Sequence, residues 1–310
     1  MTELLKQKVC ELQREISLSL ESAARGYFEV GLQLYDEQDS FLSPNVQPAL
    51  GNLAISAELL LKAVISKQVF HCLYPNLSKE KVAILSYPEN YKAGTVIKSF
   101  ELDLKGFTEK SVDFGQACSL VYSLHPDIKK NHKPHLDALA VIRNSSIHGA
   151  ILNVQKYQVE RIAYIACCLF KYFRDSEVYR GMISPQSKKL MGMIIEKFDI
   201  ERDERVHKAV ENAKKESRSL DFLDLSGGAF DGWEARTLKC PICSSPALCN
   251  GFTELEVDHE SSCASLVFSR TDFDCDGCGL TLKDPSELDL VGIDIAEDIS
   301  QLMNDWECNV

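Results

Sequence analysis

The strings Cys240-Pro241-Ile242-Cys243 and Cys275-Asp276-Gly277-Cys278 stand on either side of residues 244–274. In each string two cysteines are separated by two residues, so one tight turn can present two thiolates. Two such turns facing each other supply the four sulfur ligands of a tetrahedral Zn²⁺ site. Four thiolates leave no position for a reacting water, so the metal is expected to stabilise rather than to catalyse. The spacing predicts one structural zinc ion per chain.

Residues beside the cysteines match a known motif. Pro241 lies between the first two cysteines and Gly279 directly follows the last, as in the CPxC and CxxCG strings of the zinc-ribbon knuckle, which this segment resembles. The resemblance implies a small β-rich domain. The glycine lets the backbone curl and aim N–H groups at sulfur.

The segment between the two pairs is longer than the commonest template, so an additional β-hairpin is predicted there. Its β-forming stretches are residues 252–257 and 265–273. Cys249, His259 and Cys263 lie in this segment as rival ligands, but none has a partner at the knuckle spacing.

The composition indicates the number of domains, the state of the cysteines and the cellular compartment. The chain has 310 residues, which favours two domains, and its 12 cysteines without an export signal favour reduced thiols and metal ligation. The longest strongly apolar stretch, Ile162–Phe170, is far shorter than the ~20 residues that span a bilayer. We therefore expect a cytoplasmic protein with no membrane partner.

The net charge of -12 is unevenly distributed along the chain. Residues 221–310 carry four Lys and Arg against nineteen Asp and Glu, whereas residues 1–220 carry a small excess of basic residues. Since an acidic segment repels phosphate backbones, contact with nucleic acid is expected from the first part.

The rest of the chain has mostly helical periodicity. Apolar residues recur at helical spacing, with a possible break near Gly26, and residues 75–114 form an irregular excursion with short helices. The expected helices are 2–38, 49–73, 133–144, 154–175 and 186–219, with a short helix at 296–305.

The string Arg143-Asn144-Ser145-Ser146-Ile147-His148-Gly149 places a fixed cation, an amide and an imidazole within six residues. An arginine can bind a phosphate through two N–H groups, and a histidine can exchange a proton near neutral pH. These groups suffice for metal-free RNA cleavage, in which a ribose 2'-OH attacks the adjacent phosphorus. A capping arginine and a surface histidine are the alternative interpretation.

This string resembles the R-[polar]-x3-H motif of the HEPN superfamily, named for higher eukaryotes and prokaryotes nucleotide-binding. The string Ala57–Ala63, with Glu58 and Lys62, is similar to the acidic-apolar-lysine string in an early helix of many of these domains. The resemblance covers about residues 10–180. It implies an α-helical bundle that pairs as a homodimer, so that two motifs line one cleft.

The resemblance also implies roles for single residues. Arg143 would bind and stabilise the scissile phosphate, His148 would act as acid and base, and Asn144 would orient one of them. Glu58 could pair with Arg143; the alternative is an ordinary helix pair with Lys62, four residues along, worth only a few tenths of a kcal/mol.

The sequence thus predicts a mainly α protein: a HEPN-like helical domain (1–185), a helical connector (186–225) and a β-rich zinc ribbon with an acidic tail (226–310). The expected function is a metal-independent endoribonuclease, of the kind found in toxins and antiphage systems, with RNA as substrate and no cofactor for catalysis. The alternative is a non-catalytic HEPN adaptor that binds a protein partner through its ribbon. A zinc-ribbon transcription regulator is disfavoured by the acidic charge.

Overall fold

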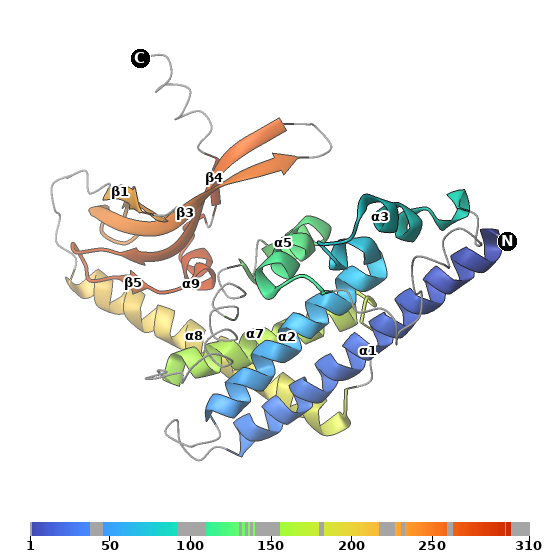
Figure 1. The fold of residues 1–310 in the computed structure, drawn as a ribbon. Coiled ribbons are helices and arrows are strands. Elements are labelled where there is room, and N and C mark those ends of the chain that lie inside the picture. The colour runs from blue at the N-terminus through green and yellow to red at the C-terminus, as the bar shows by residue number, and fades with distance from the viewer. Residues whose placement is uncertain are drawn as a thin grey trace, which may run out of the picture. The chain divides into compact units, whose positions relative to one another are not determined.

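The structure, a computed structural model, describes residues 2–37, 46–91, 110–129, 132–133, 136, 139, 156–179, 183–216, 227–230, 233–258, 263–294 and 296–298. Within these ranges the chain is mainly helical, with a small antiparallel sheet towards its C-terminal end (Figure 1). It divides into two compact units, Met1–Phe198 and Asp199–Val310, each with its own apolar core. The predicted order, helices first and a small β-rich part second, is confirmed.

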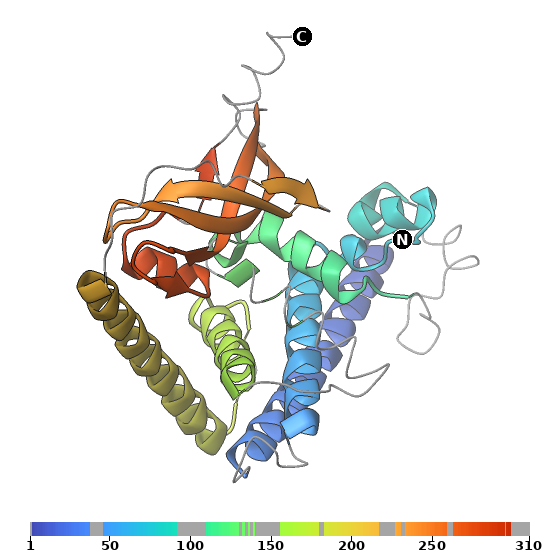
Figure 2. The same cartoon turned by 90° about the vertical axis from the view of Figure 1, so that its left-hand side faces the viewer.

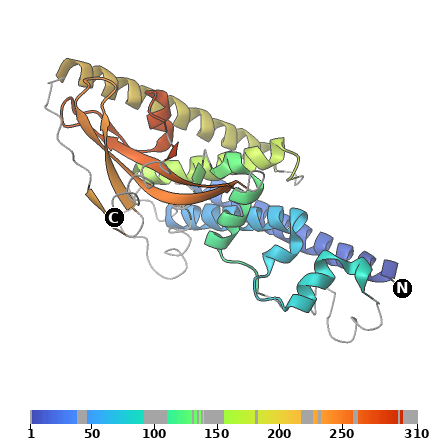
Figure 3. The ribbon, with the colours of Figure 1, turned by 90° about the horizontal axis from the view of Figure 1, so that it is seen from above.

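Helices α1 (Thr2–Asp36) and α2 (Val46–Gln68) lie side by side in the first unit (Figures 2 and 3). A Cβ atom at Gly31 would lie 2.9 Å from Cγ of Leu53 and 3.1 Å from its backbone nitrogen, so this glycine lets the two helices approach closely. Helix α1 runs unbroken through Gly26, and the predicted break there is wrong. One exposed helical glycine costs only about 0.5–1 kcal/mol, which the packing of the rest of α1 outweighs.

Helix α2 is the central element of the first unit, because it contacts α1, α5, α7 and η1. By length and composition alone it is apolar enough to cross a membrane, but most of it is buried inside the unit. A helix packed on several sides is apolar over much of its circumference, which accounts for this composition.

Short helical elements follow α2: η1 (Phe70–Leu73), α3 (Lys79–Ser86), η2 (Pro88–Asn90) and α5 (Phe114–Leu124). Helices α3 and η2 agree with the irregular excursion expected at 75–114, whereas η1 replaces the end of the helix predicted at 49–73 and α5 was not predicted. A capping box begins α5: the Asp113 carboxylate accepts from the backbone N–H of Gln116 at 2.8 Å, and the Asp113 N–H donates to the Gln116 side chain at 3.1 Å. An Asp-x-x-Gln string before an apolar run is the sequence signal for this start.

Two long helices complete the helical part: α7 (Lys156–Asp175) and α8 (Pro185–Glu216). The predicted helix 133–144 lies largely outside the described residues, although Leu136 and Leu139 are buried in the first core. Ser184 caps α8 by accepting from the N–H of Ser187 at 3.1 Å, and its own N–H donates to Oε1 of Glu29 on α1 at 2.7 Å. The start of α8 is thereby tied to α1.

In the described part of the second unit, six strands form one antiparallel sheet in the order β1-β2-β3-β4-β5, with β6 paired to β4. The strands are β1 (Gly227–Phe230), β2 (Trp233–Lys239), β3 (Pro246–Asp258), β4 (Cys263–Asp274), β5 (Thr281–Leu282) and β6 (Ala296–Asp298). The β3–β4 hairpin is the one predicted between the two cysteine pairs, and its strands are longer than expected. A short helix, α9 (Pro285–Leu290), follows β5.

The predicted helix at 296–305 is wrong where the structure describes it. Residues 296–298 form β6, which pairs with residues 267–269 of β4. A strand edge with unpaired backbone groups offers hydrogen bonds that override a weak local helix preference. Residues 299–305 lie outside the described residues.

Candidate metal centre

The two cysteine turns lie at one end of the sheet. Cys240 and Cys243 occupy the turn from β2 to β3, and Cys275 and Cys278 occupy the turn from β4 to β5. In the sheet register, Lys239 is opposite Pro246 and Asp274 is opposite Thr281, so both turns leave the sheet at neighbouring strand ends. The antiparallel pairing of β3 with β4 brings the two turns together.

The backbone of the two turns follows one pattern. The Cys240 N–H donates to the Ser245 carbonyl at 2.9 Å, and the Cys275 N–H donates to the Leu280 carbonyl at 2.9 Å. The N–H of Ser244 donates back to the Cys240 carbonyl at 2.9 Å, as that of Gly279 does to the Cys275 carbonyl at 2.7 Å. Each turn is therefore fixed by two backbone hydrogen bonds before any metal is considered.

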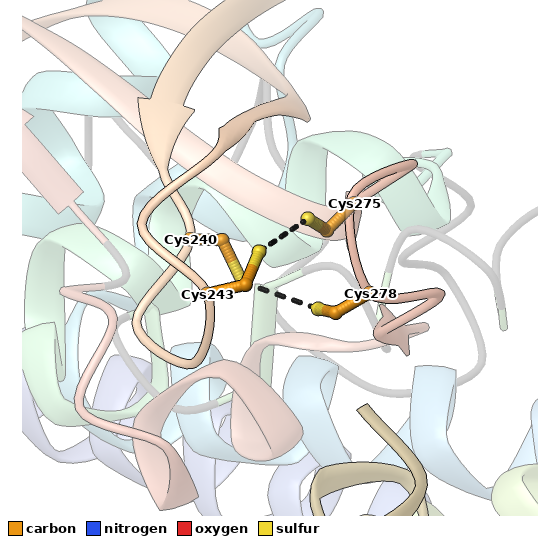
Figure 4. A group of neighbouring side chains, drawn as sticks. All are labelled: Cys240, Cys243, Cys275 and Cys278. Carbon is orange, nitrogen blue, oxygen red and sulfur yellow. Dashed lines mark hydrogen bonds between the residues drawn. The ribbon is translucent and has the colours of Figure 1, made fainter. Parts of the chain in front are cut away.

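All four sulfur atoms lie within 4.8 Å of one another (Figure 4). The Cys243 and Cys275 sulfurs are 3.5 Å apart, and those of Cys240 and Cys278 are 3.6 Å apart. Zn–S bonds of about 2.3 Å in a tetrahedron place the sulfurs about 3.8 Å apart, so the arrangement fits a tetrahedral ion. The four predicted ligands are thus brought together as a site that could hold a metal such as zinc.

The surroundings shift the pKa values of Cys243, Cys275 and Cys278 in different directions. Burial raises the pKa of Cys275 to about 11, and burial likewise raises the pKa of Cys278. Burial also acts on Cys243, but hydrogen bonds from the side chain and backbone of Ser245 lower the pKa of Cys243 to about 7. A divalent cation would favour the thiolate at each position and would displace the protons that burial retains.

The rival ligands do not join the cluster in the part of the chain that the structure describes. Cys249 is fully buried in the apolar core of the second unit, where it behaves as a small hydrophobe. The backbone of Cys263 lies opposite Asp258, at the far end of the hairpin from the cysteine turns. His259 lies outside the described residues.

Residues that the sequence analysis missed support the site. Ser245 is buried and hydrogen-bonds Cys243, and the buried carboxylate of Glu287 receives the guanidinium of Arg205 from α8. The start of α9 was readable, because Asp284-Pro285-Ser286-Glu287 has an N-cap residue and a proline at the first helical position. The pairing with Arg205 had no sequence signal, because it joins residues far apart in the chain.

The predicted catalytic residues Arg143, Asn144 and His148 lie outside the described residues, whereas the supporting residue Glu58 lies within them. Glu58 lies on α2 and forms an ion pair with Lys62, with Oε1 and Nζ 2.7 Å apart and side chains 5% and 10% exposed. Lys62 Nζ also donates to Oγ of Ser111 at 3.2 Å. Of the two partners considered for Glu58, Lys62 is the one that the described residues show.

No protein-family model, curated protein or solved structure matches this chain in comparisons of sequence and fold.

Proposed function

We propose that this chain is a metal-independent endoribonuclease of the HEPN type whose C-terminal ribbon carries one structural zinc ion. The observation that carries the proposal is the buried Glu58–Lys62 pair at the centre of the helical unit. Removing two charges from water costs several kcal/mol each, and their attraction does not reliably exceed this cost. A buried pair is therefore weak evidence for stability, which supports a role in a polar site.

The chemistry is assigned to the string 143–148. Its position in the sequence supports this, because the buried Leu139 precedes it and the buried Val159 of α7 follows it, both in the core that contains α2. Arg143 binds the scissile phosphate and stabilises the charge that develops on it. His148 takes the proton of the 2'-OH and returns a proton to the leaving 5' oxygen, and Asn144 orients one of them. A homodimer supplies two copies of the string to one cleft.

Activity on RNA in the presence of a chelator tests the nuclease. Purified protein is incubated briefly with total RNA and EDTA, and elemental analysis of the same sample checks that the ribbon keeps its metal. We expect cleavage by the wild type, loss of cleavage in His148→Ala, and full cleavage in His207→Ala, which alters an exposed histidine of α8. No cleavage of any RNA by the wild type would instead favour the non-catalytic adaptor.

Metal content tests the ribbon. We expect one zinc ion per chain in protein purified without chelators, and loss of it in Cys243→Ser and Cys278→Ser, because metal binding supplies folding energy here. Cys10→Ser, at an exposed position on α1, is the control and should keep its zinc. A zinc content near zero in the wild type would refute the zinc proposal without bearing on the nuclease.

A further inference from the structure

The two ends of helix α8 are buried in different cores. Met191 and Ile194 belong to the apolar cluster of the first unit. Val206 and Ala213 belong to the cluster that contains Cys240, Cys275 and Cys278, and they are 6% and 1% exposed. One continuous helix, Pro185–Glu216, is thus held at each end by a separate set of side chains.

The C-terminal part of α8, which packs in the core of the second unit, has a narrow apolar stripe. Ala209 and Val210 are partly buried against the same cluster, so Val206, Ala209, Val210 and Ala213 follow one another at helical spacing. Away from this stripe, Asp203, Glu204, Lys208 and Lys214 are charged and exposed. Isolated helices of this length are marginal in water, so this part depends on the core that covers its stripe.

An ion pair also links α8 to α9 within the second unit. The Arg205 Nε–H donates to Oε1 of Glu287 at 2.8 Å, and Nη2 reaches the same oxygen. The other oxygen of Glu287 accepts from the N–H of Lys283 at 2.6 Å. Glu287 is 2% exposed, and its helix α9 begins seven residues after Cys278, so the ion pair joins α8 to the segment that follows the second cysteine turn in the sequence.

We propose that metal binding at the four cysteines determines how far α8 extends. With the metal bound, the cysteine turns complete the core that covers the stripe, and the helix runs to Glu216. Without it, this small core loses its main stabilising bonds, the stripe is uncovered, and the helix ends near Phe198, where the core of the first unit still holds it. The proposal rests on the metal centre proposed above and is independent of the nuclease.

Hydrogen exchange read by mass spectrometry on the full chain tests this proposal. Exchange is compared between metal-loaded protein and protein stripped by a chelator, with the metal content of both measured. Amides of residues 203–214 should exchange at least about tenfold faster after stripping, together with those of the cysteine turns, while residues 188–197 stay unchanged. Retained protection at 203–214 in protein whose cysteine turns have lost theirs would overturn the proposal. Failure to load any metal would instead refute the metal centre.

A matched pair of variants on α9 tests whether the Arg205–Glu287 ion pair holds the C-terminal part of α8. Glu287→Gln removes the buried charge, and Asp289→Asn removes an exposed charge two residues away. With one metal ion bound in each, Glu287→Gln should speed exchange at 203–214 severalfold, and Asp289→Asn should leave it unchanged. Equal exchange in the two variants would show that Glu287 does not hold the helix.

Discussion

Ser244 and Gly279 occupy the same place in the two cysteine turns. Each directly follows the second cysteine of its pair, each donates its N–H to the carbonyl of the first cysteine, and each has a positive φ, 61° for Ser244 and 70° for Gly279. This left-handed conformation costs an L-residue roughly 1–2 kcal/mol, whereas glycine adopts it freely. One turn therefore has the favoured residue and the other carries strain.

Ser244→Gly and Gly279→Ala should change stability in opposite directions. Gly279→Ala introduces the left-handed penalty and should lower the free energy of unfolding by about 1–2 kcal/mol. Ser244→Gly removes it but makes the unfolded chain more flexible, so a gain of only about 0.5–1 kcal/mol is expected. Denaturant unfolding of the metal-loaded second unit, followed by Trp fluorescence, measures both. A change of the same sign in the two variants would contradict the equivalence of the turns.

Metal affinity should fall as pH falls. The pKa of Cys275 is raised to about 11 and that of Cys278 is also raised, so both thiols are protonated at neutral pH in the metal-free protein. Binding must release at least these two protons, so affinity should drop at least about 100-fold for each unit of falling pH. Competition with a chromophoric chelator between pH 6.5 and 8 gives the slope. An affinity independent of pH would mean that the thiols are already ionised.

Two glycines of α1 offer a comparison that isolates helix packing. A Cβ at Gly26 has nothing within 4 Å, whereas a Cβ at Gly31 would meet the side chain and backbone of Leu53. Gly26→Ala should therefore stabilise the first unit by about 0.5–1 kcal/mol through helix propensity. Gly31→Ala should forfeit this gain, because α1 and α2 must separate slightly and lose packing. Thermal unfolding of the two variants checks the order, and equal shifts would contradict the close approach.

The sequence was sufficient to predict those features of the structure that a local residue pattern determines. The two Cys-x2-Cys strings identified four sulfurs that the fold brings together, and apolar periodicity identified α1, α2, α7 and α8. Local patterns failed where distant partners decide: β6 forms because β4 offers it hydrogen bonds, and the pairing of Arg205 with Glu287 has no local signal. The capping box of α5 was a local signal that the sequence analysis did not use.

Variants of the buried Glu58–Lys62 pair can test whether the pair has a functional role or only a structural one. Glu58→Gln alone leaves the Lys62 ammonium buried without its carboxylate and should cost about 3–5 kcal/mol. The double variant Glu58→Gln with Lys62→Met removes both charges and should recover most of that loss. If the pair serves the proposed nuclease, the double variant stays folded by circular dichroism but cleaves RNA more slowly. Wild-type cleavage in a folded double variant would assign the pair to the fold alone.

The nature of the cleavage product follows from attack by the 2'-OH. In the proposed nuclease the oxygen that attacks phosphorus belongs to the substrate, so we expect a 2',3'-cyclic phosphate and a free 5'-hydroxyl as products. DNA and 2'-O-methyl RNA lack this nucleophile and should be inert. Loss of the His148 acid/base group should lower the rate by ~10² to 10⁴, and Arg143→Ala should cost a comparable factor by removing charge stabilisation.

The matched cation control is Lys171→Ala, at an exposed position of α7, which should cleave RNA at the wild-type rate. Mass spectrometry of a short oligonucleotide identifies the terminal groups, and circular dichroism checks that each variant is folded. Because the three variants remove one proton carrier, one proposed phosphate ligand and one surface charge, their rates distinguish a specific site from a general loss of RNA binding. Cleavage of DNA by the wild type, or equal losses in Arg143→Ala and Lys171→Ala, would show that the chemistry belongs to other residues.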